Sequence, residues 1–203
     1  KILTIGSVAE YGHASVMPIT EDAPIAPVDV YGLIKAAQCR SAMTFWEYFG
    51  LDVVHVRQFN ASGTGQNGAF VLPSVTRQIA AVRASGSSSG TIIAGDLSAI
   101  RDFLDIRNVV TAYRILLENG VPGQCYNVCS GKGHSVREVI ELAAQLAGVV
   151  ISPQVEPSLV RTGEKRKNEL IGDATRLRKL GWEPLYRIQD ILSSLLEFWA
   201  HNA

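Results

Sequence analysis

Tyr31 and Lys35 form a pair whose residue types and spacing could move a proton. They lie four residues apart near the start of a segment that favours a helix, so both side chains project from one helix face, one turn apart. An ammonium beside a phenol favours the phenolate, which lets the hydroxyl exchange a proton near neutral pH. Taken alone the spacing is weak, because most such pairs are an exposed lysine beside a half-buried tyrosine.

Ser7 adds a hydroxyl at a position where α/β proteins bind ligands. Residues 1–5 form a short β-rich run, and Gly6 and Ser7 follow at its carboxyl end. Open parallel sheets bind ligands outside the carboxyl ends of their strands. The Ser7 hydroxyl could therefore hydrogen-bond the same substrate oxygen that Tyr31 protonates.

Two glycine-rich stretches suggest phosphate-binding loops, but both lack part of the pattern. Residues 63–68 read G-x-G-x-x-G, yet the next helix begins only at Pro73 and no acidic residue ends the following strand. Residues 130–133 lack the upstream glycine of a P-loop, because Tyr126 occupies that position. We predict a mobile loop for the first stretch and a strand-to-helix turn for the second. The histidines, at positions 13, 55, 134 and 201, have no metal-ligand spacing, so no metal site is expected.

The elements that must position these residues alternate between strand and helix. Asp29 is a suitable N-cap and Gly50 a suitable stop for the helix that carries Tyr31, and Ser135 with Glu138 forms a capping box. The Ser/Gly run at 84–90 predicts a flexible surface loop. The alternation predicts an α/β fold with a parallel sheet and right-handed crossovers. Predicted strands are 1–5, 51–57, 91–94 and 124–128, and predicted helices are 30–49, 73–83, 106–119, 135–147 and 188–201.

Charge and composition exclude several classes of partner. The chain has 19 basic and 19 acidic residues and no basic run, so nucleic acid is not an expected partner. No apolar run approaches the roughly 20 residues that span a bilayer, so no membrane segment is expected. Three cysteines are too few for a disulfide framework, which favours a reduced, cytoplasmic setting. They are expected to be small buried hydrophobic residues.

Several further motifs accompany the Ser, Tyr and Lys residues. They are a strand-end serine followed by Tyr-Gly at 5–12, the Tyr/Lys helix at 30–35, and segments at 57–60, 101–105, 125–131 and 172–184. With them, nearly the whole sequence resembles the extended short-chain dehydrogenase/reductases, which are nucleotide-sugar epimerases, dehydratases and reductases. Gln58 replaces the proline usual in the family. The run from 101 to 138 is most similar to the GDP-sugar branch.

The resemblance implies roles for individual residues. Tyr31 resembles the general acid/base, and Lys35 resembles the residue that activates it and holds the nicotinamide ribose of NAD(P). Ser7 resembles the hydroxyl that polarises the sugar oxygen, and Asn60 the amide that binds the sugar nucleotide.

Three arginines complete the set that the resemblance implies. Arg77, Arg101 and Arg161 lie where members of the family place basic residues near the diphosphate, for which a guanidinium fork is well suited. A surface arginine without a ligand is the competing interpretation for each. Thr162 follows Arg161 where the family usually has proline.

The resemblance also predicts the architecture: the C-terminal part of a Rossmann-like parallel sheet plus a small substrate-binding α/β region. Residues 1–60 would form the partial Rossmann-like catalytic portion, and 61–203 mainly the substrate-binding region, with segments returning to the sheet. Family members begin with a dinucleotide loop and about four strands that have no counterpart here. We therefore expect a fragment, inactive alone, with NAD(P) bound mainly by the missing portion. Helix 30–49 is apolar over more than one face, and its counterpart in the family forms a homodimer contact.

Three functions fit this resemblance. The first is reduction of an NDP-4-keto-6-deoxyhexose, with GDP as the expected nucleotide. The alternatives are a nucleotide-sugar 4-epimerase or 4,6-dehydratase, and a non-catalytic sugar-nucleotide-binding relative. Dehydration needs a second acid/base carboxylate, which the resemblance places two residues after Ser7, where this chain has Ala9. Glu10 is expected to face away, because neighbours on an extended segment point to opposite faces. Reduction is therefore favoured.

Overall fold

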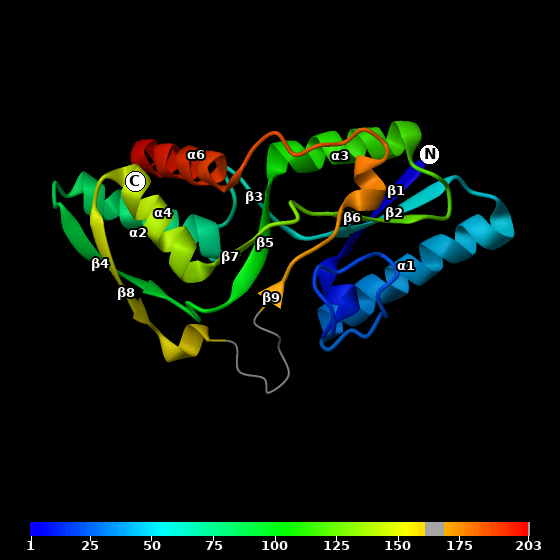
Figure 1. The fold of residues 1–203 in the computed structure, drawn as a ribbon, viewed down its shortest axis with the longest axis horizontal. Helices are drawn as coiled ribbons and strands as arrows, with labels where there is room; N and C mark the ends of the chain where they lie inside the picture. The colour runs from blue at the N-terminus through cyan, green and yellow to red at the C-terminus, as the bar shows by residue number, and fades with distance from the viewer. Residues whose placement is uncertain (161–168, 203) are drawn as a thin grey trace.

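The first strand and its partners form a short parallel sheet. In the computed structural model, which describes residues 1–160 and 169–202, β1 (Ile2–Ser7) pairs with β2 (Val53–Gln58), and β2 pairs with β6 (Cys125–Val128). The register places Ile2 beside Val53 and Ser7 beside Gln58. Figure 1 shows these strands between α1 (Val30–Phe49) and α3 (Ile106–Asn119).

The two faces of β2 differ in chemistry because successive side chains on a strand alternate between faces. Val54 and Val56 are fully buried in a hydrophobic cluster that includes Leu116 of α3. His55 and Arg57 lie on the other face, where α1 packs against β1 and β2. Helices thus cover both faces of this sheet, and β2 is buried on both sides.

The rest of the chain builds two smaller sheets. One has the order β3-β5-β7, with β9 also paired to β5, and the β5–β7 pairing is antiparallel. The other is the parallel pair β4-β8. The strands are β3 (Asn60–Ser62), β4 (Ser89–Ala94), β5 (Ile100–Asp105), β7 (Gly133–Ser135), β8 (Val150–Val155) and β9 (Glu169–Leu170).

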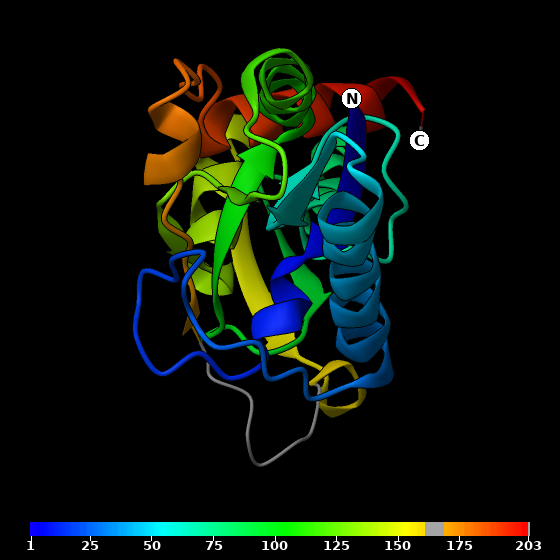
Figure 2. The ribbon, with the colours of Figure 1, turned by 90° about the vertical axis from the view of Figure 1, so that its right-hand side faces the viewer.

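Two hydrophobic clusters stabilise the chain. The first joins α2 (Val71–Ala84), α4 (Val136–Ala147) and α6 (Ile188–His201), with Ile79, Ile140 and Leu192 at its centre. The second lies around β2, β6 and α3 and includes Trp182, which follows the short α5 (Thr175–Arg178). Figure 2 shows α1 running along the side of the molecule beside the β1 strand. None of the helices described is long and apolar enough to cross a bilayer.

Most predicted helices are confirmed, and the exceptions have local causes. The helices predicted at 30–49, 106–119 and 188–201 have those limits, and Ser135 caps α4 with the predicted box. The helix predicted to start at Pro73 begins two residues earlier, with Pro73 in its first turn, where its missing N–H has no intrahelical partner to lose.

The strand predictions were less complete. The loop predicted at 84–90 is shorter, because Ser89 and Gly90 already pair with β8. The predicted α/β fold with a Rossmann-like parallel sheet is confirmed by β1, β2 and β6, and the antiparallel pairing of β5 with β7 lies outside that sheet. Strands of two or three residues carry no periodic signal, and Pro153 inside β8 argues against a strand in the sequence.

Candidate active site

Ser7 is held rigidly at the end of β1. It is the N-cap of the 3-10 helix η1 (Val8–Tyr11), and its Oγ accepts the Ala9 N–H at 3.2 Å. Its own N–H donates to Oε1 of Glu10 at 2.8 Å, which completes a capping box. The segment after Ser7 was expected to be extended, and this was wrong: it turns at once.

The first turn of α1 packs directly on this 3-10 turn. Asp29 Oδ1 accepts the Gly32 N–H at 2.8 Å, which fixes where the helix begins. A Cβ on Gly32 would lie 2.5 Å from the Ala9 carbonyl oxygen, so only glycine permits the close approach. Gly32, which lies between Tyr31 and Lys35, therefore allows the first turn of α1 to lie against the segment that follows β1.

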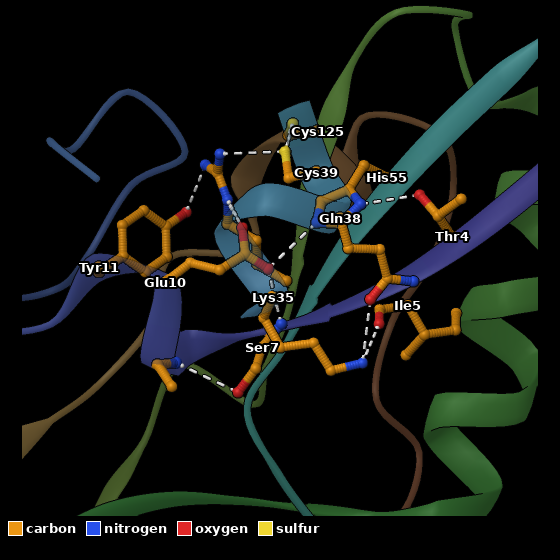
Figure 3. A network of polar contacts seen from close by, with 12 residues as sticks. Thr4, Ile5, Ser7, Glu10, Tyr11, Lys35, Gln38, Cys39, His55 and Cys125 are labelled. Carbon is orange, nitrogen blue, oxygen red and sulfur yellow. Dashed lines mark hydrogen bonds and ion pairs between the residues drawn. The ribbon is translucent and has the colours of Figure 1, made fainter. Parts of the chain in front are cut away.

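Lys35 reaches back from α1 to β1, as Figure 3 shows. Its Nζ donates to the Ile5 carbonyl at 2.7 Å and to Gln38 Oε1 at 3.2 Å. Ile5 lies two residues before Ser7 on β1, so the structure places Lys35 at the strand end beside Ser7. Tyr31 lies one turn before Lys35 and is 56% exposed.

A buried ionic network lies behind this edge, and the sequence did not predict it. The Oε1 of Glu10 also lies 3.1 Å from His55 Nε2, and Arg57 Nε donates to Oε2 at 3.0 Å (Figure 3). All three residues are at most 5% exposed. Thr4 Oγ1 lies 2.8 Å from the other ring nitrogen of His55.

The charges of this network stabilise one another. Burial alone would raise the pKa of Glu10, but hydrogen bonds from His55 and the Ser7 N–H and the positive charge nearby outweigh it, and the pKa is lowered. Burial alone would lower the pKa of His55, but Cys39 and Glu10 raise it. A Cβ on Gly6 would overlap both Glu10 and His55, which explains a glycine in this strand.

Arg57 extends the network to the loop before α1. Its Nη1 donates to the Tyr11 hydroxyl at 3.1 Å and to the Glu21 carbonyl at 3.0 Å. The Tyr11 hydroxyl in turn donates to Asn127 Oδ1 at 2.7 Å. The Arg57 guanidinium on β2 thus contacts η1 and the loop before α1 directly. Through the Tyr11 hydroxyl it is also linked to Asn127 on β6.

Three types of metal ligand meet in this network, although the histidine spacing predicted no metal site. One ligand atom each from Glu10, Cys39 and His55 lies within 4.8 Å of the others. The Arg57 guanidinium is 3.0 Å from the Glu10 carboxylate and 3.8 Å from Cys39 Sγ, so it already supplies the positive charge. A second cation there would be repelled by Arg57.

The residues predicted to bind substrate lie on several elements. Asn60 Nδ2 donates to the Asp102 carbonyl at 3.3 Å, which places it beside β5, the strand that carries Arg101. Arg101 Nη1 donates to the Ile100 carbonyl at 2.7 Å. Arg77 is exposed on α2, against the loop at Gly68. The structure therefore brings Asn60 and Arg101 to neighbouring strands, while Arg161 lies outside the described residues.

The two glycine-rich stretches are held by the protein itself. The Asp102 carboxylate accepts the N–H groups of Ser130 at 2.8 Å, Gly131 at 2.9 Å and Gly172 at 3.2 Å. These three N–H groups therefore donate to the Asp102 carboxylate and are not free to bind a phosphate. In the other stretch, Gln66 closes the turn by bonding to Ser62 and to the Ala61 carbonyl.

A parallel sheet with a strand-end serine, followed by a helix that carries Tyr-x-x-x-Lys, defines a Rossmann-like protein of the NAD-dependent epimerase/dehydratase class. The chain belongs to the GDP-mannose 4,6 dehydratase family, whose model matches residues 1–195.

Relatives within this class have several activities. The chain is 35% identical over 200 residues to GDP-6-deoxy-D-mannose reductase of Pseudomonas aeruginosa, covering 97% of this chain and 65% of that protein. It is 29% identical to UDP-glucose 4-epimerase of Corynebacterium glutamicum, covering 96% and 61% respectively. The structure of RMD from Pseudomonas aeruginosa complexed with NADPH matches with a TM-score of 0.90 at 33% identity, covering 99% of this chain and 66% of that one. The chain thus spans less than two thirds of the length of these curated relatives.

Proposed function

We propose that the intact protein containing this chain reduces an NDP-4-keto-6-deoxyhexose, with GDP as the nucleotide, at the expense of NAD(P)H. The observation that supports the proposal is the packing at the end of β1, where the first turn of α1, which carries Tyr31, lies against η1 at Gly32 and where Lys35 Nζ donates to the Ile5 carbonyl. Ala9 holds the position that a dehydratase would use, and Glu10 is buried in its pairing with His55. The similarity to a GDP-6-deoxy-D-mannose reductase supports the same choice.

The chain's own groups would handle the proton and the substrate oxygen. NAD(P)H would supply the hydride to the sugar C4. The Tyr31 phenol donates a proton to the C4 oxygen as it becomes an alkoxide, and the Ser7 hydroxyl hydrogen-bonds the same oxygen. Lys35 stabilises the phenolate that remains. Ile5 and Gln38 use two of the three N–H donors of Lys35, which leaves one to hold a ribose hydroxyl of the cofactor.

The nucleotide and diphosphate of the substrate would be bound at strands β3 and β5. Asn60 and Arg101 lie on paired strands there, and Arg77 and Arg161 would add guanidinium groups for the diphosphate. In this proposal residues 1–60 form the catalytic portion and 61–203 mainly the substrate-binding region. The separate hydrophobic cluster of α2, α4 and α6 supports that division.

We further propose that most contacts to the dinucleotide come from residues outside these 203, because both glycine-rich stretches are engaged within the protein. Titration of the 203-residue chain with NADPH and with NADH should then show no binding tighter than millimolar and no turnover. Micromolar binding by this chain would contradict the proposal. We also propose a reduced, cytoplasmic setting for the intact protein, because three cysteines are too few for a disulfide framework.

A 4-epimerase is the second candidate, since it is equally compatible with Ala9 and since several relatives are epimerases. A 4,6-dehydratase is disfavoured, because Ala9 stands where its second acid/base carboxylate would be. A non-catalytic sugar-nucleotide-binding protein would be distinguished by the absence of bound nicotinamide from the purified intact protein.

Paired substrate assays test the proposed reaction. Intact protein supplied with GDP-4-keto-6-deoxymannose should oxidise NAD(P)H, whereas GDP-mannose with NAD(P)+ should yield no product. Formation of the 4-keto-6-deoxy sugar from GDP-mannose, with Ala9 in place, would overturn the choice of reduction over dehydration.

A homodimer through α1 is part of the proposal. This helix buries only Gly32, Cys39 and Ala42 within the chain. Its other faces expose a set of large apolar side chains, which favours burial against a second copy. They include Val30, Leu33, Ile34, Phe45, Tyr48 and Phe49.

Sedimentation of intact protein at tens of micromolar should therefore show a dimer. Phe49→Arg on this helix should shift the protein towards monomer, whereas Phe70→Arg, which changes an exposed phenylalanine outside α1, should leave the dimer intact. A wild-type protein that sediments only as a monomer would rule the interface out.

A further inference from the structure

Two cysteine thiols that are far apart in the sequence meet behind the catalytic edge. Cys39 on α1 and Cys125 on β6 have their sulfur atoms 3.8 Å apart (Figure 3). A disulfide bond is about 2.05 Å long, so closure needs a movement of about 1.8 Å. Side-chain rotation and a small shift of the helix could provide it. The third cysteine, Cys129, is fully buried in the hydrophobic cluster around β6.

The surroundings of Cys39 favour its thiolate, the form that reacts with oxidants. Arg57 Nη2 lies 3.8 Å from its sulfur, and a ring nitrogen of His55 lies within 4.8 Å of it. The hydrogen bond from Cys125 lowers the pKa of Cys39, and His55 and Arg57 act in the same direction against the effect of burial. The same hydrogen bond, together with burial, raises the pKa of Cys125. Because Arg57 Nη2 donates to Cys39 Sγ, we assign the thiolate to Cys39 and the S–H to Cys125.

Access and location also suit a reactive pair. Cys39 itself is buried at 8% exposure, but Cys125, 3.8 Å away, is only half-buried, so a small oxidant would reach Cys39 from the side of Cys125. Cys39 lies one helical turn after Lys35 on the face of α1 that meets the sheet. A covalent bond at this point would join the helix that carries Tyr31 and Lys35 to β6.

We propose that Cys39 and Cys125 form a redox-active dithiol that hydrogen peroxide converts to a disulfide between α1 and β6. The Cys39 thiolate attacks one peroxide oxygen, the O–O bond breaks, and the released hydroxide takes a proton to become water. Cys39 is then a sulfenic acid, oxidised by two electrons. The Cys125 sulfur gives up its proton and attacks Cys39, which forms the S–S bond and releases the sulfenic oxygen as water. In sum, two thiols and one peroxide give one disulfide and two waters.

Peptide mapping after a limited peroxide treatment tests this directly. The purified protein is treated with a small excess of hydrogen peroxide, alkylated, digested without reductant and analysed by mass spectrometry. The expected product is one cross-linked pair of peptides containing Cys39 and Cys125, lighter by two hydrogen atoms and separated by dithiothreitol. Cys129 should remain free to be alkylated once the protein is unfolded. Full alkylation of Cys39 and Cys125 at a peroxide dose that oxidises free cysteine would overturn the proposal.

Two matched variants separate the proposed chemistry from general oxidation. In Cys125→Ser the second step is impossible, while the hydroxyl can still donate to Cys39, so Cys39 should accumulate as a sulfenic acid that dimedone labels. Cys129→Ala removes a thiol outside the pair and should form the Cys39–Cys125 disulfide as the wild type does. Equal dimedone labelling of Cys39 with and without Cys125, or a disulfide that joins two separate chains, would contradict the assignment. These readouts do not depend on the proposed reductase activity.

Discussion

Replacement of Tyr31 by phenylalanine should lower kcat for ketone reduction by about 10²- to 10⁴-fold, the usual contribution of a positioned general acid. The phenol is the group that would protonate the C4 alkoxide, and no other hydroxyl stands on that helix turn. Because the Tyr31 side chain is mostly exposed, its ring can remain in place and the fold should be unaffected. KM for the sugar nucleotide should change little.

Tyr48→Phe is the matched control, since it removes a hydroxyl from the other end of the same helix but keeps the ring that the proposed dimer contact would bury. Steady-state rates of the two variants and the wild type, with unfolding curves to confirm equal stability, decide the matter. Reduction at the normal rate by Tyr31→Phe would remove Tyr31 from the proposed mechanism.

Truncation of Glu10 should have the largest effect on stability. Glu10→Ala leaves His55 and Arg57 buried without their carboxylate, and the removal of one partner from a buried ion pair typically costs about 3–5 kcal/mol. It also removes the acceptor of the Ser7 N–H, so the strand end itself should loosen. The free energy of unfolding in urea measures this loss.

Glu47→Ala provides the comparison, because Glu47 pairs with Arg40 on the surface of α1 at 3.3 Å. An exposed pair contributes about 1 kcal/mol or less. A loss below about 1 kcal/mol for Glu10→Ala, equal to that for Glu47→Ala, would mean that the buried network does not stabilise the fold.

The same network should make stability depend on pH. The pKa of Glu10 is lowered below 4.5, so its contribution is complete above that value and is lost as the pH falls through the lowered pKa. The pKa of His55 is raised above 6.5, so its contribution is complete below 6.5 and is lost as the pH rises through the raised pKa. The free energy of unfolding, measured in urea across this pH range, should be largest between the pKa of Glu10 and the pKa of His55. In His55→Gln it should fall less steeply on the alkaline side of that maximum.

The sequence predicted those parts of the fold that local signals define. Asp29 and Gly50 mark both ends of α1, and Ser135 with Glu138 marks the start of α4, because caps are local chemistry. The short strands β3, β7 and β9 were missed, since pairing with β5 rather than any periodic pattern makes them strands. Tyr31 and Lys35 were predicted from their spacing and Ser7 from its position at a strand end, and the roles of all three stay predictions.

The buried network could not be predicted in the same way. Glu10 meets Arg57 only because η1 turns directly after Ser7 and β1 lies in register with β2, with Gly6 beside Arg57. Cys39 meets Cys125 only through the packing of α1 on the sheet, which no local pattern in the sequence indicates. One signal was present: His55 and Arg57 stand at alternate positions of an otherwise apolar strand, which indicates a polar partner on one face.

The most direct test of the proposed function follows the hydride. Intact protein is supplied with GDP-4-keto-6-deoxymannose and NADPH or NADH deuterated at the transferred position, and the product is examined by NMR and mass spectrometry. A reductase places one deuterium on the sugar C4 for each cofactor oxidised, and this is the result we predict. An epimerase would recycle a bound cofactor without net oxidation, and a dehydratase would move the hydride within its own substrate. A product without deuterium at C4, or turnover without consumption of the added cofactor, would contradict the assignment.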